Sequence, residues 1–334
     1  MMYSLNEIGI IPSGTPTDIN SRKQVNPKDE NDKYPIFVSP MTSILNANNY
    51  TKFDDAGVIP VLPRNIKFDK KLSKTYWQSV SLQEFEAMAN SDEDYNGCHV
   101  LVDIANGHIG KLYDLSDKFK RAWPNSVLMI GNIANPEIYK YSCYAGVDYV
   151  RCGVGGGSVC STSIVTSCHG SLQYIVEGIT SIRKSFNSMN INELKEYYPN
   201  FKLTKIIADG GVNTIGKAMV CLAIGYDYVM MGKLFAQCEE ACGEVIRTKN
   251  DGKQRKYYGM ASEQGQIDIS GGANKCPEGI QTFVPVTTTL EGFMKQFDAA
   301  IRSTMSYVGA HNLEELHHAH YEIMSEAEFK AYYK

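Results

Sequence analysis

The sequence of 334 residues predicts an α/β fold in the form of a closed (β/α)8 barrel of the TIM type. Eight short runs rich in β-branched and aromatic residues recur along the chain, and most are continuously apolar, as in strands buried on both faces of a parallel sheet. Most spacers between them have room for one helix and two loops. The length also suits one such barrel, which commonly has about 250 residues or more.

The expected strands follow in this order: Ile36–Ser39, Val58–Leu62, Trp77–Leu82, His99–Ile104, Val127–Gly131, Asp148–Arg151, Lys205–Asp209 and Asp227–Met231. Helical spacers are seen, for example, at Pro136–Ala145 and Ile215–Ile224. An open doubly wound sheet is the alternative, but eight buried parallel strands favour closure. We expect a single domain over residues 1–334, without a regulatory insert.

Composition narrows the class of protein. The net charge is −4, so no strongly basic surface is available for nucleic acid. No apolar run is long enough to span a bilayer, and the N-terminal residues lack a secretory signal pattern. Nine cysteines, an odd number without a C-x-x-C pair, suit reduced thiols. We expect a cytoplasmic globular protein without a nucleic-acid or membrane partner.

Two long gaps interrupt the strand rhythm, one after Arg151 and one after the eighth strand. Active sites of barrels form at the C-terminal strand ends, where long loops usually carry function. The first gap opens a loop over about residues 152–170, whose glycines allow the backbone to approach a ligand closely. Cys160 in this loop is a candidate nucleophile, and the alternative is an incidental cysteine in a flexible loop.

Two further glycine clusters follow strands seven and eight, Asp209-Gly210-Gly211 and Met231-Gly232-Lys233. The loops after these strands commonly hold phosphate, which glycine amides bind well. Phosphate would repel Asp209, so this carboxylate more plausibly binds the two hydroxyls of a ribose. A helix N-cap is the alternative role for Asp209.

The segment Gln264–Cys276 is polar and lacks an apolar helical stripe, so we expect a mobile flap over about residues 261–280. Four histidines gather in His311–His320, but their spacing is not that of a helical zinc site. We therefore expect a solvated C-terminal helix there, and no zinc.

Taken together, these clusters resemble the IMP dehydrogenase / GMP reductase family. Matching motifs run in order from Ser21-Arg22 to Ile301-Arg302-Ser303-Thr304, and the pattern G-x-G-x-G-S-x-C-x-T at residues 153–162 is highly specific for the family. The resemblance implies a purine nucleotide substrate, a nicotinamide cofactor and a homotetramer with shared sites.

Within the family, the sequence looks closer to GMP reductase. That enzyme converts GMP to IMP and ammonia with NADPH, through a thioimidate that the resemblance assigns to Cys160. The dehydrogenase activates water with an Arg-Tyr pair on a long flap, and Ala261–Glu278 contains neither residue. IMP dehydrogenase, which oxidises IMP to XMP with NAD, is the runner-up on the same scaffold. A non-catalytic purine-nucleotide-binding relative is the alternative of another class.

The resemblance also implies roles for individual residues. Cys160 would be the nucleophile, and Thr162 with Glu278 would protonate the departing amine. Substrate contacts would come from Ser158, Asp209, Gly210, Gly211, Gly232, Lys233, Tyr258, Gly259, Met260 and Gly279. Cofactor contacts would come from Asn65, Asp103, Ile104, Ala105, Asn132, Val154 and Gly155, and across a subunit boundary from Ser21, Arg22, Ser303, Thr304, Met305 and Ser306. The carbonyl oxygens of Gly155, Gly157 and Cys160 would bind a monovalent cation, usually K+.

The sequence departs from the family pattern at several positions. Ser163 stands where an arginine is usual, and Thr42 stands where the family has aspartate. Leu62-Pro63-Arg64-Asn65 replaces a lysine flanked by histidine. Lys233 replaces a glycine or serine, which could strengthen phosphate binding. The segment Thr166–Gly170 is one residue longer than the family version.

Overall fold

In the computed structural model, which describes residues 5–248, 252–272, 276–325, 327–328 and 331, eight parallel strands close a barrel. Consecutive strands hydrogen-bond to each other, and the first pairs with the last to complete the ring. The strands are β2 (Ile36–Val38), β3 (Ile59–Leu62), β4 (Trp77–Val80), β5 (His99–Asp103), β6 (Val127–Ile133), β7 (Tyr149–Cys152), β8 (Lys205–Asp209) and β9 (Tyr228–Met231). The predicted closed (β/α)8 barrel and all eight of its predicted strands are confirmed.

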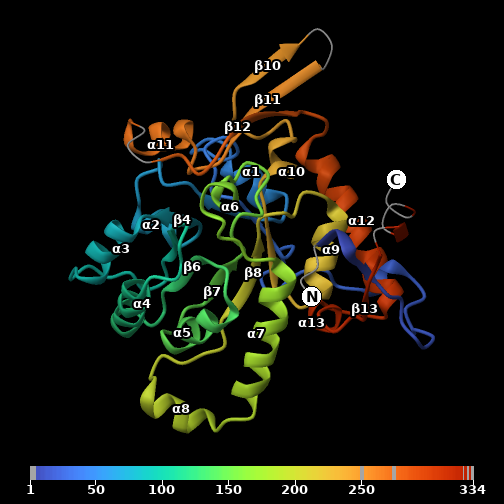
Figure 1. Ribbon diagram of the computed structural model, residues 1–334, viewed down its shortest axis with the longest axis horizontal. Helices are drawn as coiled ribbons and strands as arrows, with labels where there is room; N and C mark the ends of the chain where they lie inside the picture. Colours follow the sequence, from blue (N-terminus) through green and yellow to red (C-terminus); the bar gives the residue numbers. More distant parts are fainter. Residues whose placement is uncertain (1–4, 249–251, 273–275, 326, 329–330, 332–334) are drawn as a thin grey trace.

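Helices surround the barrel (Figure 1). They are α1 (Tyr50–Asp55), α2 (Lys70–Ser73), α3 (Leu82–Ala89), α4 (Gly110–Ala122), η3 (Pro136–Ile138) with α5 (Tyr139–Tyr144), α6 (Thr162–Thr166), α7 (Leu172–Asn187), α8 (Ile191–Tyr197), α9 (Ile215–Ala223), α10 (Lys233–Ala236) and α12 (Leu290–Val308). Among the described residues, no helix combines the length and the apolar character needed to cross a membrane.

The barrel interior is layered, because alternate side chains of each strand point inward. An apolar cluster fills the middle with Phe37, Val61, Trp77, Leu101, Met129, Ile207, Tyr228 and Met230. On three of these strands, the inward position two residues further along is charged. Asp103 follows Leu101, Arg151 follows Tyr149, and Asp209 follows Ile207. The fold thus places a charged layer on top of the apolar plug, at the C-terminal strand ends.

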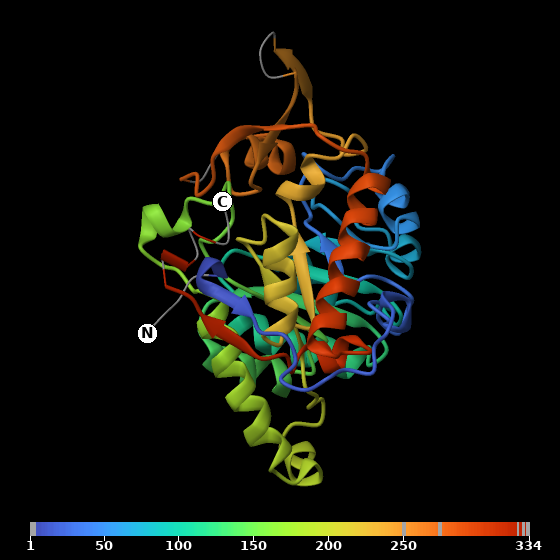
Figure 2. The ribbon, with the colours of Figure 1, turned by 90° about the vertical axis from the view of Figure 1, so that its right-hand side faces the viewer.

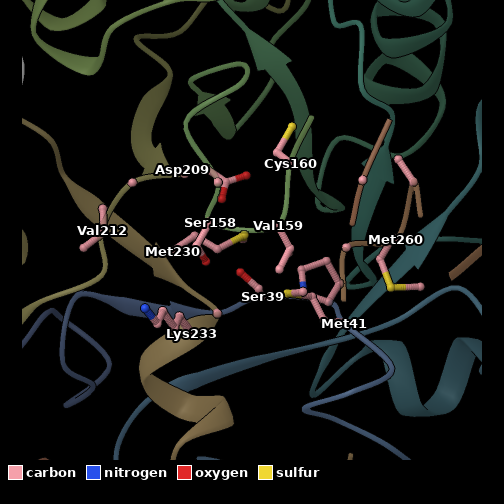
Figure 3. Close-up of a pocket in the computed structure, with 18 of the residues that line it drawn as sticks. Ser39, Met41, Ser158, Val159, Cys160, Asp209, Val212, Met230, Lys233 and Met260 are labelled. Atoms are coloured by element: carbon pink, nitrogen blue, oxygen red, sulfur yellow. The ribbon is translucent and has the colours of Figure 1, made fainter. Parts of the chain in front are cut away.

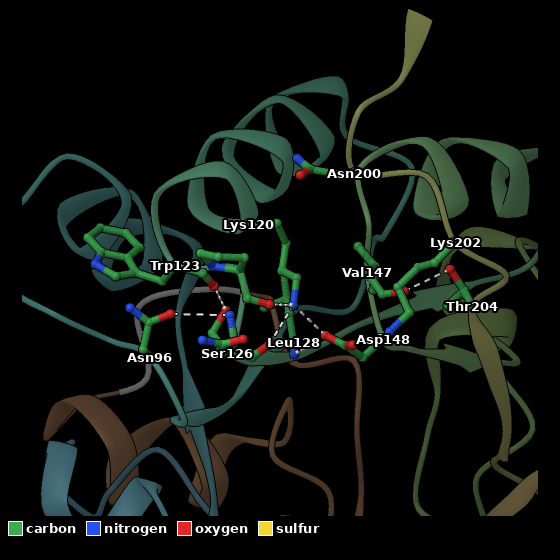
Figure 4. Close-up of polar contacts among 12 residues, drawn as sticks. Asn96, Lys120, Trp123, Ser126, Leu128, Val147, Asp148, Asn200, Lys202 and Thr204 are labelled. Atoms are coloured by element: carbon green, nitrogen blue, oxygen red, sulfur yellow. Dashed lines mark hydrogen bonds and ion pairs between the residues drawn. The ribbon is translucent and has the colours of Figure 1, made fainter. Parts of the chain in front are cut away.

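At the N-terminal ends of the strands, Asp148, which precedes β7, connects neighbouring elements (Figure 4). Its carboxylate pairs with the ammonium of Lys120 at 3.0 Å and with that of Lys202 at 2.5 Å. It also accepts the backbone N–H of Leu128 at 2.8 Å. Because Lys120 lies on α4 and Leu128 on β6, one carboxylate joins two strands and a covering helix.

Smaller sheets extend the barrel. The strands β10 (Val245–Thr248), β11 (Gly252–Tyr258) and β12 (Gln281–Pro285) form an antiparallel sheet whose hairpin projects beyond one end, whereas α8 lies beyond the other (Figure 2). Near the termini, β1 (Ile8–Ile10) pairs with β13 (Tyr321–Ile323). The remaining short elements are η1 (Leu5–Glu7), η2 (Arg22–Gln24) and α13 (Leu313–Leu316).

Two segments differ in secondary structure from what the sequence suggested. The segment expected to be a mobile flap contains a helix, α11 (Glu263–Ser270), which starts at a Ser262 cap and ends at Gly271 in the left-handed conformation; the mobility of the flap stays a prediction. Capping and tertiary contacts, not an apolar stripe, stabilise it; residues 273–275 of the flap lie outside the described residues. The histidine-rich stretch contains only the single turn α13, after which His317 is half-buried and the chain enters β13.

Candidate functional site

A pocket with a cavity volume of about 200 Å³ lies at the C-terminal ends of the barrel strands (Figure 3). Its wall includes many residues that the sequence singled out, on loops after five different strands and on the flap. They are Asp103, Gly157, Ser158, Cys160, Asp209, Gly210, Gly211, Gly232, Lys233, Gly259, Met260, Glu278 and Gly279.

Cys160 sits where the loop after β7 meets the flap. Its backbone pairs with Gly279, and the N–H of Ser161 donates to the carbonyl of Glu278 at 2.9 Å. The half-buried thiol lies 3.3 Å from the hydroxyl oxygen of Thr162. A thiol, a hydroxyl and a carboxyl group therefore come from two short paired segments, with the thiol and the carboxyl group both in the pocket wall.

Asp209 is held by one of its two oxygens. Oδ2 accepts hydrogen bonds from Nδ2 of Asn132 at 2.8 Å and from Nε of Arg151 at 2.9 Å. No described residue donates to Oδ1, so this oxygen is available to a ligand in the pocket. Asp209 does not cap a helix, because the N-cap of α9 is Thr214. The arrangement suits a carboxylate that binds ligand hydroxyls.

Arg151 joins the two carboxylates of the charged layer. Its Nη1 lies 2.6 Å from Oδ1 of Asp103, while its Nε binds Asp209. Arg64 approaches the other oxygen of Asp103 at 3.5 Å. Burial raises the pKa of Asp103, but the charges of Arg151 and Arg64 outweigh burial and hold that pKa below its ordinary value. The pKa of Arg151 is likewise lowered by burial but raised overall by the two carboxylates, so both groups remain charged.

The other end of the pocket combines flexible glycines with a lysine. Gly210 has φ +89°, and a Cβ there would lie 3.1 Å from the backbone nitrogen of Gly157, so the loops after β7 and β8 can meet only through glycine. At Gly232 an added Cβ would lie 2.7 Å from the hydroxyl of Tyr257. Burial raises the pKa of Tyr257 to about 12, so its phenol is a neutral hydrogen-bond donor. With Lys233, this end suits an anion such as phosphate.

Several residues singled out in the sequence lie outside the pocket wall. Thr162 contacts Cys160, and Asn132 contacts Asp209. The hydroxyl of Tyr258 binds Asp268, while its neighbour Tyr257 lines the pocket. The remaining residues outside the wall are Ser21, Arg22, Asn65, Ile104, Ala105, Val154, Gly155, Ser303, Thr304, Met305 and Ser306.

Sequence reasoning missed Arg151 and Tyr257. The signal for Arg151 was a charged residue at the C-terminal end of the predicted strand Asp148–Arg151, at the same phase of alternation as Tyr149. The side chains of Tyr257 and Tyr258 point to opposite faces of β11, as expected for a strand, and sequence alone did not indicate which face meets the pocket. Ser39, Met41 and Met230 also line the wall.

Two of the three loop carbonyls expected to bind a monovalent cation each accept one hydrogen bond in the structure. The carbonyl of Gly155 accepts a hydrogen bond from the hydroxyl of Ser163 at 3.4 Å, and that of Gly157 accepts one from the N–H of Cys160 at 3.0 Å. Each carbonyl oxygen keeps a second lone pair, and carbonyl oxygens suit K+. For a nicotinamide cofactor, the polar groups of Asp103 and Arg151, which line the same pocket as Cys160, are candidate hydrogen-bond partners.

Comparison with known proteins agrees with this geometry. Residues 79–331 match the family model described as "IMP dehydrogenase / GMP reductase domain". Similar proteins include an inosine-5'-monophosphate dehydrogenase of Nitrosopumilus maritimus, 32% identical over 70% of this chain and 47% of that protein. They also include GMP reductases of Vibrio campbellii, 33% identical over 69% of this chain, and Shewanella pealeana, 32% identical over 69%; each alignment covers 61% of the relative. The chain thus spans about half to three fifths of the length of these relatives. With a matched domain over most of its length and a closed barrel beneath the pocket, the chain belongs to the IMP dehydrogenase / GMP reductase family.

Proposed function

We propose that this protein is a GMP reductase, which converts GMP to IMP and ammonia with NADPH. The observation that supports this choice is the pairing of the Cys160 loop with a flap that carries Glu278. Between Ala261 and Glu278 the chain has no arginine or tyrosine to activate water. A site that expels ammonia needs a proton donor at this position, whereas a site that hydrolyses an adduct needs a base.

The chemistry follows from the three groups at that wall. The Cys160 thiolate adds to C2 of the guanine ring, and the 2-amino group departs as ammonia to leave a thioimidate. Because an unprotonated amine is a poor leaving group, Glu278 supplies the proton through the hydroxyl of Thr162. NADPH supplies the hydride that reduces C2, and the thiolate leaves as IMP forms. Overall, GMP, NADPH and two protons give IMP, NADP+ and ammonium.

Binding of the nucleotide uses the rest of the pocket. The free oxygen of Asp209 binds the ribose hydroxyls, and Lys233 with the adjoining glycine amides binds the phosphate. Met260 lies on the far side of the pocket from Lys233 in the view of Figure 3, next to the expected place of the base. Asp103 and Arg151 adjoin the nicotinamide. The proposal includes a K+ ion on the loop carbonyls of Gly155, Gly157 and Cys160.

The proposal also includes a homotetramer with shared sites. Ser21 and Arg22 lie next to α12, since Nη1 of Arg302 donates to the carbonyl of Arg22 at 3.4 Å. Together with Ser303, Thr304 and Ser306 on the same helix, they form a polar patch outside this chain's own pocket wall, whereas Met305, which the resemblance also assigned to the cofactor, is fully buried. In the proposal, this patch completes the cofactor site of a neighbouring subunit.

Absorbance of the reduced cofactor distinguishes the candidate functions. With GMP, loss of NADPH absorbance is the expected result. Formation of NADH from NAD and IMP would instead identify an IMP dehydrogenase, an alternative supported by relatives of that name at equal identity. Tight binding of GMP or IMP without either reaction would identify a nucleotide-binding protein that is not an enzyme.

Replacing Cys160 with alanine tests the nucleophile. We expect Cys160→Ala to abolish turnover while the dissociation constant for GMP stays within about tenfold, because the thiol acts in the chemical step. The matched control is Cys168→Ala, which removes an exposed thiol from the same loop and should keep full turnover. Turnover by Cys160→Ala would exclude this thiol from the mechanism.

A further inference from the structure

The carboxylate of Asp268 connects the flap helix α11 to two other segments. Oδ2 accepts a hydrogen bond from the hydroxyl of Tyr258 at 2.6 Å and another from the hydroxyl of Thr42 at 2.7 Å. Oδ1 accepts one from Nε2 of Gln264 at 2.9 Å. Gln264 is itself oriented by Lys256, whose ammonium lies 3.0 Å from Oε1. The described donors to this carboxylate thus come from β11, from the segment after β2 and from α11 itself.

Both anchors of Asp268 adjoin the wall of the nucleotide pocket. Thr42 directly follows Met41, which lines the pocket, and Tyr258 directly precedes Gly259 and Met260, which also line it. The hydroxyl of Thr42 in addition lies 3.9 Å from the sulfur of Met260. Asp268 thus closes a ring of contacts around the end of the pocket that Met260 borders.

Close packing of α11 gives a second, independent indication. At Gly265, on the first turns of α11, a Cβ would lie 2.6 Å from the carbonyl oxygen of Gly259 and 2.7 Å from the Cα of Met260. The helix therefore rests directly on the backbone that forms the pocket wall. Any displacement of α11 would move this stretch of wall.

From these contacts we propose that Asp268 is a positioning residue, which holds α11 against the barrel and thereby keeps Met260 in place for the base of the nucleotide. The proposal rests on the proposed function only in taking a purine nucleotide as the occupant of the pocket. Tyr258, which the sequence suggested as a substrate contact, acts in this arrangement as an anchor for Asp268.

The ionised state of Asp268 agrees with this role. Burial raises its pKa, but the hydrogen bonds donated by Tyr258, Thr42 and Gln264 outweigh burial and bring the pKa below its ordinary value. Charge-assisted hydrogen bonds are stronger than neutral ones, so one carboxylate can hold the helix.

Four variants and one control test the proposal. Asp268→Ala removes the acceptor, Thr42→Val and Tyr258→Phe each remove one donor, and Asp268→Asn keeps one carbonyl acceptor. Glu263→Gln is the control, because it removes an exposed carboxylate from the same helix without touching the ring of contacts. Amide hydrogen exchange of residues 259–272 is measured without nucleotide, and GMP is then titrated.

We expect Asp268→Ala to speed amide exchange in α11. We also expect it to raise the dissociation constant for GMP about tenfold, because about a tenth of the free molecules would then keep the pocket wall in the conformation that binds GMP. Because saturating GMP restores the wall, kcat should stay within about threefold while KM rises. Asp268→Asn should have intermediate exchange and affinity, and Thr42→Val should add little further effect in a protein that already carries Asp268→Ala.

Unchanged exchange in Asp268→Ala, or an equal loss of affinity in Glu263→Gln, would overturn the proposal. Failure of the wild-type protein to bind GMP or IMP would refute the proposed function instead, while the exchange result still decides whether Asp268 holds α11.

Discussion

Arg151 is the residue on which the charged layer of the barrel depends. Its planar guanidinium presents separate N–H groups to Asp103 and Asp209, a geometry that a lysine ammonium cannot reproduce at both partners. The same side chain orients Asp209 so that one oxygen stays free. Because Arg151 holds both carboxylates, we expect it to affect nucleotide binding through Asp209 without contacting the purine.

Substitutions of Arg151 separate geometry from charge. Arg151→Lys keeps the charge and loses one charge-assisted hydrogen bond, so we expect GMP binding to weaken by about 1.5–3 kcal/mol while the fold persists. Arg151→Met removes the cation between Asp103 and Asp209, which leaves Asp103 only the longer contact with Arg64 and leaves Asp209 only the hydrogen bond from Asn132. We expect this variant to lower the free energy of unfolding by up to about 3–5 kcal/mol. Urea unfolding and GMP titration measure the two effects. A methionine variant as stable as the wild type would contradict the structural role given to this ion network.

At the scale of elements, Gly153 brings the loop after β7 into close contact with the end of β8. Gly153 has φ +118°, and an added Cβ would lie 2.3 Å from the carbonyl oxygen of Asp209. Neither the backbone conformation nor the space accepts a side chain. The junction therefore fixes how the Cys160 loop leaves the barrel beside Asp209.

Gly153→Ala should accordingly destabilise the protein by about 2–3 kcal/mol, from backbone strain and overpacking combined. Gly14→Ala provides the control, because a Cβ at that position has no atom within 4 Å and the backbone has no positive φ. The melting temperature of the two variants, measured by calorimetry, compares them. Equal melting temperatures would mean that the junction adjusts without cost.

The elements also show what sequence can and cannot predict. The barrel strands were predicted because burial on both faces leaves continuous apolar runs. The sheet β10–β12 was not, since charged and polar residues interrupt its strands and most of β10 and β12 is exposed. Helix α11 was missed because Gly271, Ser262 and the contacts of Asp268 stabilise it without an apolar stripe. Such contacts join segments far apart in sequence and become visible only once the chain is folded.

Predicting the site shows the same division. Glycine patterns indicated the loops, and Cys160 and Asp209 could be recognised within them. Arg151 could have been found by counting two residues along each strand from the apolar plug, which places it level with Asp103 and Asp209. The choice between Tyr257 and Tyr258 depends on how β11 faces the barrel, which is a property of tertiary packing.

At the scale of the whole molecule, the polar patch on η2 and α12 lies outside the pocket wall of its own chain. The side chain of Arg22 is exposed, while its backbone is held by Arg302. Arg302 also donates to the carbonyl of Val25 at 2.7 Å and pairs with Asp298 at 2.8 Å. Arg302 thus holds the backbone of η2 against α12, while the side chains of Ser21 and Arg22 are exposed. In the proposed tetramer, these exposed side chains would meet the cofactor of a neighbouring subunit.

Subunit complementation tests that arrangement. Cys160→Ala subunits lack the nucleophile but keep the patch, and Arg22→Ala subunits keep the nucleophile but lose a cation suited to cofactor phosphate. If each site takes Cys160 from one subunit and Arg22 from the next, random one-to-one mixing in a closed ring restores about a quarter of the sites. We therefore expect the co-refolded mixture to oxidise NADPH with GMP faster than the mean of the two separate variants. If every subunit built its whole site from its own chain, mixing would give only that mean, because no combination of subunits would then contain an intact site.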